Sequence, residues 1–162
     1  GGHDSYEIRF TPGDCREPQL VHISKWVKVT AFPLNHKIEC YGYRFDEIVT
    51  ERHWQENPAY HPKSYAYCSD TAPFPELAEW VRGVDLLYHE ATYPDEMEAL
   101  ANEYMHSTSR QAALVAAAAQ VGQLCIGHYS GRIEDEEAHL HEAQAVFPNT
   151  LLSRERMVVK VK

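Results

Sequence analysis

The stretch HSTSRQAALVAAAAQVGQLCIGH, residues 106–128, decides the fold. Its first part predicts a helix, because Ser107 or Thr108 suits the N-cap, alanine dominates the interior and Gly122 suits the C-terminal end. The alanines also indicate close packing of this helix against a sheet. The run QLCIG that follows is short and apolar, which predicts a buried strand that ends at His128. A helix followed directly by a buried strand is typical of α/β proteins.

The same alternation of strand and helix extends to both sides of this stretch. Residues 24–34 alternate between two faces until Pro33, which predicts a strand. Further strands are predicted at 41–45, 64–70, 84–91 and 156–162, and further helices at 70–81 (opening near Asp70 or Thr71), 94–105 and 134–147. We expect one mixed sheet, with helices that begin near Thr108 and Glu134 covering one face. The other face should be apolar and suited to a second sheet.

Length and composition place the chain among ordinary globular domains. With 162 residues, 44% of them apolar and 24% charged, it is long enough for one domain with its own core. It contains no apolar run long enough to cross a membrane, and its start does not resemble a signal peptide. Its four cysteines are scattered without a C-x-x-C pair, which argues against a zinc ribbon or a disulfide framework. These features predict a cytoplasmic protein without a membrane partner.

Residues that bind metals or move protons stand at the ends of several predicted strands. They are His36, Asp70, Glu90 and His128, and His106 joins them where a loop enters a helix. Ligand sites of α/β sheets lie off the carboxyl ends of strands, and histidine and aspartate are ligands of Zn²⁺. The net charge of −9 disfavours a basic nucleic-acid-binding face, but bound metal ions can reverse the local sign. Because the spacing alone is a weak signal, histidines that only cap loops are the alternative interpretation.

The remaining histidines fit structural or solvent-exposed positions. His89 precedes Glu90 on a strand and therefore points to the opposite face, where it should pack in the core. Cys68 and Cys125 fit small core residues in the same way. Solvent-exposed positions are predicted for His22, His53, His61, His139 and His141.

Five short motifs resemble, in order, those of the ribonuclease Z family. These are the tRNA 3′-processing endonucleases of the metallo-β-lactamase superfamily. The motifs are FPLNHKIECYGYRF (32–45), YCSDT (67–71), HEATY (89–93), HSTSRQAA (106–113) and IGHYSGR (126–132). The resemblance covers about residues 27–150. It implies a four-layer αββα sandwich of two pseudo-equivalent halves, with a two-zinc site at the edges of the sheets.

The resemblance also implies a role for each of the five site residues. His36 corresponds to a ligand of the first zinc, Asp70 to the carboxylate that bridges both ions, and His128 to a ligand of the second. Glu90 and His106 correspond to a catalytic pair, in which the histidine stabilises charge near the scissile phosphate or protonates the leaving 3′-oxygen. Two zinc ions, or other divalent metals, would lower the pKa of a shared water that attacks the phosphorus. Free N–H groups of the helix that begins beside His106 are expected to favour the phosphate.

The chain departs from the family pattern at its start. The motif H-x-H-x-D-H, which supplies most zinc ligands, is absent, and the nearest stretch is GGHDSYE at 1–7. This stretch looks like a tag remnant or a broken segment boundary. We therefore expect residues 1–162 to be one metallo-β-lactamase-like domain, incomplete at the amino end, that supplies about the carboxyl half of the fold. Such a chain has too few ligands to close either zinc shell and should be inactive alone.

A second departure lies at residues 46–63. At this position the bacterial members carry a long arm that grips the tRNA elbow, and here only DEIVTERHWQENPAYHPK is present. The segment is a remnant of the arm or a replacement for it.

Three functions remain open from the sequence. The first is a zinc-dependent endoribonuclease that removes the 3′ trailer from precursor tRNA, acting as a homodimer in which one subunit's arm presents tRNA to the other's site. The second is a related metallo-hydrolase that acts on small phosphodiesters or esters, which a missing arm would favour. The third is an inactive half-domain that lacks the H-x-H-x-D-H motif.

Overall fold

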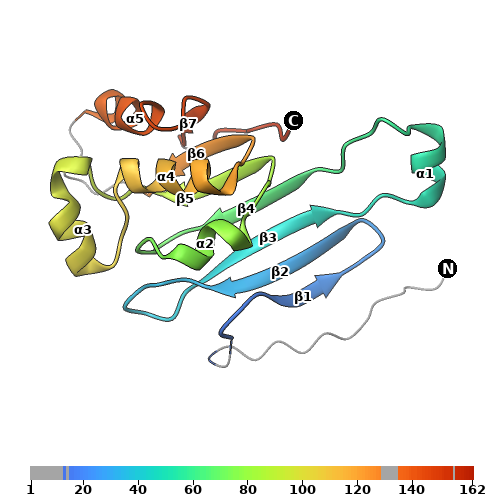
Figure 1. The fold of residues 1–162 in the computed structure, drawn as a ribbon, viewed down its shortest axis with the longest axis horizontal. Coiled ribbons are helices and arrows are strands. Elements are labelled where there is room, and N and C mark those ends of the chain that lie inside the picture. The colour runs from blue at the N-terminus through green and yellow to red at the C-terminus, as the bar shows by residue number, and fades with distance from the viewer. Residues whose placement is uncertain (1–12, 14, 129–134, 155) are drawn as a thin grey trace.

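Figure 1 shows the computed structural model of the chain, which describes residues 13, 15–128, 135–154 and 156–162. Within these residues seven strands form one sheet in the order β1 to β7. The strands are β1 (Gln19–Ile23), β2 (Val27–Pro33), β3 (Tyr41–Glu47), β4 (Ser64–Cys68), β5 (Leu86–Glu90), β6 (Gln123–Gly127) and β7 (Thr150–Leu152). Neighbouring strands from β1 to β4 pair antiparallel, and those from β4 to β7 pair parallel.

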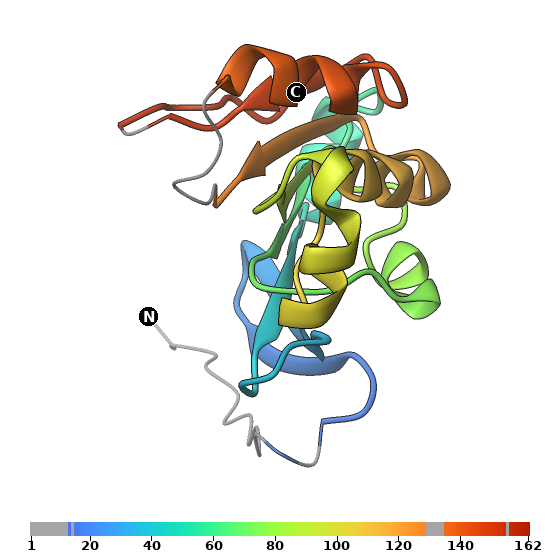
Figure 2. The same ribbon diagram turned by 90° about the vertical axis from the view of Figure 1, so that its left-hand side faces the viewer.

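Together with the mixed sheet, the flanking helices confirm the predicted α/β class. They are α1 (Glu51–Glu56), α2 (Pro75–Trp80), the 3₁₀ turn η1 (Asp95–Met97), α3 (Glu98–Tyr104), α4 (Ser109–Ala119) and α5 (Glu136–Gln144). Figure 2 shows α2, α3 and α4 together on one side of the sheet. None of the described helices is long and apolar enough to cross a membrane.

The core lies between the sheet and α4. One face of this helix, with Ala112, Ala113, Ala116 and Ala119, is buried, so its backbone comes close to β5 and β6, as predicted. The N-cap is Thr108, one of the two predicted residues, and it forms a capping box with Gln111. Fully buried side chains of this core include Phe32, Leu77, Leu87, Ala112, Ala116, Leu124 and Ile126.

The predicted C-cap at Gly122 is wrong, and its glycine serves a different purpose. The helix ends at Gln120, which adopts a left-handed conformation with φ 54°. Gly122 lies in the tight connection to β6, where its N–H donates to the Val84 carbonyl at 2.9 Å. A Cβ at this position would lie 2.7 Å from the carbonyl oxygen of Asp85, so the close approach of two backbones requires glycine.

Two other predicted boundaries are wrong. The helix expected over 70–81 begins only at Pro75, because Asp70 has φ 61° and Ala72 pairs with Asn35 instead of entering a helix. The strand expected over 156–162 does not form, and the last strand is the three-residue β7. The expected helix start at Glu134 lies outside the described residues, and α5 is capped by Asp135.

Two of the remaining histidines are buried, although a solvent position was predicted for one of them. His89 is fully buried, as predicted. His139 is only 2% exposed, contrary to the prediction, because α5 packs against α4. Its Nε2 donates to the Ala91 carbonyl at 2.7 Å. Burial lowers the pKa of both rings, because it disfavours their charged forms.

The sheet face opposite the helices is rich in aromatic residues. Tyr65 stacks on Phe45 with ring centroids 5.8 Å apart, and Tyr67 stacks on Tyr88 at 4.9 Å. A cavity of about 420 Å³ lies over Tyr65 and Tyr88, and Val161 of the C-terminal segment lines its other side. This face has the apolar character predicted for the contact with a second sheet.

We expect the buried histidine of α5 to make the fold sensitive to acid. The folded-state pKa of His139 is lowered, so below its ordinary value of about 6.5 the unfolded chain binds more protons than the folded one. The free energy of unfolding should therefore fall as the pH drops below about 6.5, by at most about 1.4 kcal/mol per pH unit for this one proton. His139→Gln should flatten the decrease, as measured by urea denaturation of the full-length protein between pH 7 and 5. An unchanged slope relative to the exposed-site control His141→Gln would contradict this account.

Candidate metal centre

The sheet topology brings the predicted site residues to one edge. Strands β4, β5 and β6 are parallel neighbours. Two antiparallel pairings separate β2 from β4, so β2 runs in the same direction as they do. The carboxyl ends of these four strands therefore share one edge, and His36, Asp70, Glu90 and His128 all lie at or just beyond it.

Hydrogen bonds join the loops at this edge to one another. The Asn35 N–H donates to Thr71 Oγ1 at 3.1 Å, and the Ala72 N–H donates to the Asn35 carbonyl at 2.8 Å. Ser107 Oγ donates to the Thr71 carbonyl at 2.7 Å. The HST motif thus has a separate task for each residue, because His106 enters the site, Ser107 anchors the loop and Thr108 caps α4.

Unusual backbone conformations mark two of the site residues. Asp70 and His128 both have left-handed φ angles, of 61° and 60°. A non-glycine residue in this region costs of the order of 1–3 kcal/mol, and such residues cluster at functional sites. Met105, with φ 56°, directly precedes His106 and ends α3 in the same conformation.

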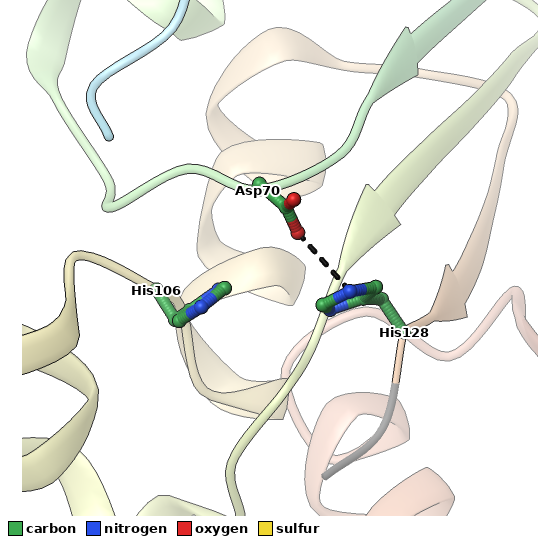
Figure 3. Close-up of side chains that lie close together, drawn as sticks. All are labelled: Asp70, His106 and His128. Carbon is green, nitrogen blue, oxygen red and sulfur yellow. Dashed lines mark ion pairs between the residues drawn. The ribbon is translucent and has the colours of Figure 1, made fainter. Parts of the chain in front are cut away.

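Three side chains from separate segments converge at the edge. Asp70 follows β4, His106 precedes α4 and His128 follows β6, and one ligand atom from each lies within 4.8 Å of the others. Figure 3 shows the two imidazole rings facing each other with Asp70 beside them. The ring centroids of the histidines are 5.7 Å apart, and Asp70 Oδ1 lies 3.2 Å from His128 Nε2. This arrangement has the donor set of a divalent metal site.

A buried carboxylate, that of Glu90, lies beside the three converging side chains and contacts one of them, His106. Glu90 is fully buried, and its Oε1 accepts from the Thr71 N–H at 3.0 Å and from His106 Nδ1 at 2.7 Å. Its Oε2 accepts from the N–H of Thr92 at 3.0 Å and from the Thr92 hydroxyl at 2.7 Å. The structure therefore brings the predicted pair Glu90 and His106 into direct contact. Because Nδ1 donates to the carboxylate, Nε2 of His106 keeps its lone pair free.

A buried carboxylate oxygen without a hydrogen-bond donor indicates that a cation fits this site. Asp70 Oδ1 is buried and accepts no hydrogen bond from the described residues. A buried carboxylate oxygen without a donor costs free energy, and a divalent ion between Asp70 and His128 would remove that cost. The three ligand-capable residues fit such an ion, and a tetrahedral zinc would require at least one ligand more.

His36 lies beside this group and is not one of its three members. Its ring centroid is 4.8 Å from that of His106. Its Nδ1 lies 2.9 Å from the Met105 carbonyl oxygen, which can only accept, so Nδ1 carries the proton and Nε2 has a free lone pair. This tautomer leaves His36 able to bind a metal ion.

The structure also adds two residues that sequence reasoning missed. It differs from expectation at the N–H groups at the start of α4. Thr71 and Thr92 contact Glu90 directly, although the motifs that contain them were used only for their acidic residues. Two of the N–H groups at the start of α4 that were expected to be free are occupied. Ser109 N donates to the Tyr93 carbonyl, and Gln111 N donates to Thr108 Oγ1. The stretch 1–7 lies outside the described residues.

The cysteines take no part in this centre. All four are free, and Cys68 and Cys125 are buried, as predicted. Burial raises the pKa of the Cys125 thiol to about 11, so little thiolate exists at neutral pH.

Comparison with known proteins agrees with this α/β fold. The beta-lactamase superfamily domain matches residues 14–129, which is most of the chain. The chain therefore belongs to the beta-lactamase superfamily. Within it, the chain is 35% identical over 193 residues to a ribonuclease Z of Bacteroides thetaiotaomicron, covering 97% of this chain and 61% of that protein. It is 40% identical to a ribonuclease Z of Parabacteroides distasonis, covering 96% of this chain and 63% of that protein. The resemblance predicted from the motifs is confirmed.

Solved structures show the same fold at lower identity. The human short-form tRNase Z has a TM-score of 0.68 at 22% identity and covers 91% of this chain and 48% of its own. The metallo-beta-lactamase fold protein YhfI of Bacillus subtilis has a TM-score of 0.72 at 19% identity, with coverage of 94% and 55%. The chain spans about three-fifths of the length of the curated relatives above.

If Asp70 and His128 bind a divalent metal ion, replacing either residue should weaken metal binding by the full-length protein, and zinc is the ion to test. Asp70→Asn and His128→Ala should each weaken zinc binding. Loss of a residue that only contacts a metal ligand weakens metal binding roughly 10- to 100-fold, so loss of a ligand itself should have at least this effect. Metal analysis after dialysis measures this, with His22→Ala on the exposed edge strand as the control. Full zinc retention in both site variants would show that the metal lies elsewhere.

Proposed function

We propose that the full-length protein is a zinc-dependent endoribonuclease that removes the 3′ trailer from precursor tRNA. The observation that carries the proposal is the contact of the buried Glu90 with His106, beside the ligand-capable Asp70 and His128. Relatives named ribonuclease Z share 35–40% identity with almost the whole chain, which supports the choice of RNA over other phosphodiesters.

Asp70, His128 and His36 would hold the metal ions in this proposal. Asp70 offers a buried oxygen without a donor, and His36 offers a free Nε2. Two zinc ions, or other divalent ions, would lower the pKa of a bound water and supply hydroxide at neutral pH. The further ligands would come from an H-x-H-x-D-H motif elsewhere in the full-length protein, because this chain lacks one.

His106 would move the proton to the leaving 3′-oxygen. Its Nδ1 is held by Glu90, so the opposite nitrogen is the one that can meet a substrate atom. A carboxylate in direct contact also stabilises the positive charge that the ring carries when both nitrogens are protonated. His106 is 15% exposed and Glu90 is fully buried, so the pair is anchored on one side and accessible on the other.

Residues 46–63 would provide the contact to tRNA, as a remnant of the family's arm or a replacement for it. Figure 1 shows α1 at the end of the sheet that lies opposite α3. The base of the segment is fixed, because the Glu47 carboxylate accepts from the Tyr60 hydroxyl at 2.6 Å and from the Lys63 N–H at 2.9 Å. Because β3 is antiparallel to β4, the segment begins at the edge away from the site. This placement supports a homodimer in which each segment serves the partner's site, and a cytoplasmic location belongs to the same proposal.

The short segment also favours a second candidate function. The alignment with the Bacteroides thetaiotaomicron ribonuclease Z runs over 193 residues, more than the 162 of this chain, so that relative contains residues with no counterpart here. A related metallo-hydrolase that acts on small phosphodiesters or esters would need no tRNA-binding arm.

We expect the full-length protein, loaded with zinc, to cleave a precursor tRNA at its 3′ trailer. His106→Ala should lower the cleavage rate by roughly 10²–10⁴, the contribution of general acid–base catalysis, without loss of metal. The control is His141→Ala on the exposed face of α5, which should cleave at the normal rate.

Three other outcomes would contradict parts of this proposal. If His106→Ala loses its zinc, His106 is a ligand and the assigned role is wrong. If the variant keeps full activity, the proton comes from another group. If the wild-type protein hydrolyses bis(p-nitrophenyl) phosphate but leaves precursor tRNA intact, the small-substrate function replaces the one proposed.

A further inference from the structure

The hydroxyl of Thr92 joins three side chains of the site. Thr92 is 5% exposed and lies just after β5. Its Oγ1 lies 2.7 Å from Glu90 Oε2, 3.2 Å from His106 Nδ1 and 3.0 Å from His128 Nδ1. The two histidines belong to segments that are 22 residues apart in sequence, so this hydroxyl is a shared contact between them.

Counting protons assigns the direction of each of these hydrogen bonds. A hydroxyl has one proton to donate and two lone pairs to accept with. An ionised carboxylate can only accept, so the Thr92 proton goes to Glu90. The proton on Nδ1 of His106 is already placed by its shorter contact with Glu90, at 2.7 Å. Thr92 has lone pairs left to accept with, so its contact with His128 places a proton on Nδ1 of that ring. Nε2 of each ring then keeps a free lone pair.

The assignment explains the unsatisfied oxygen of Asp70. With its proton on Nδ1, His128 has only a lone pair at Nε2 to offer to Asp70 Oδ1, which lies 3.2 Å away. Two acceptors that face each other repel, and a cation between them removes the conflict. The opposite tautomer would instead let His128 donate to Asp70, and the two residues would satisfy each other without metal.

We infer that Thr92 is a positioning residue that holds His128 in the Nδ1–H tautomer and so keeps the Asp70–His128 pair open for a divalent cation. The inference rests on the proposed metal site and adds a residue to it. Thr92 touches neither the metal nor the substrate in this inference, and it acts through the ring of His128.

The test compares Thr92→Val, which keeps the shape but removes the hydroxyl, with Thr92→Ser, which keeps the hydroxyl. Thr150→Val is the matched control, because Thr150 is also buried and its hydroxyl bonds only the Phe147 carbonyl among the described residues. Histidine ¹⁵N spectra of the zinc-free full-length protein report the tautomers, and titration with Zn²⁺ reports the affinity. Wild type, Thr92→Ser and the control should show Nδ1–H at both rings. Thr92→Val should convert His128 to Nε2–H and weaken zinc binding roughly 10- to 100-fold.

Two results would overturn the inference. One is an Nε2–H tautomer at His128 in the wild-type protein, which needs no variant and decides the matter even if Thr92→Val does not fold. The other is wild-type zinc affinity in folded Thr92→Val. Failure of the wild-type protein to cleave precursor tRNA would refute the proposed function but would leave both readouts as they are.

Discussion

The carboxylate of Glu90 is fully buried at the end of β5, where four donors surround it. A charge in such a position is tolerated only when its hydrogen bonds are complete, because desolvation costs several kcal/mol otherwise. Each donor comes from a part of the site, namely the loop after β4, the loop after β5 and the segment before α4. The cost of leaving Glu90 unpaired therefore holds these segments in one arrangement.

The positions of the side chains proposed to bind metal follow from this arrangement. Asp70 directly precedes Thr71, whose N–H is fixed on Glu90, and His106 is fixed on Glu90 itself. His128 is linked to Glu90 indirectly, because its Nδ1 contacts the Thr92 hydroxyl. The left-handed backbone at Asp70 and His128 is unfavourable locally, and the surrounding hydrogen bonds offset it. The site is thus organised before any ion binds, which is what a metal centre for catalysis needs.

Hydrophobic patterns and helix caps in the sequence predicted the elements whose form depends mainly on neighbouring residues. The apolar runs of β5 and β6 and the alanine-rich α4 have clear periodicity and caps, so their type and approximate position could be predicted. The strand β1 could not, because it is a half-exposed edge strand with an irregular register between Leu20 and His22. Gly122 was misassigned because its need for glycine arises from contact with Asp85, 37 residues away in sequence. The candidate site residues other than His106 could be named because they end strands, whereas Thr92 could not, because its hydroxyl matters only through contacts between distant segments.

The central claim is that the edge built on Glu90 binds a divalent ion between Asp70 and His128. Anomalous diffraction at the zinc edge from crystals of the full-length protein tests it most directly. The account predicts a peak at about 2.0–2.2 Å from Asp70 Oδ1 and from His128 Nε2, with His106 Nδ1 still on Glu90. A zinc peak away from both residues, or a crystal saturated with zinc that shows no peak between them, would contradict it.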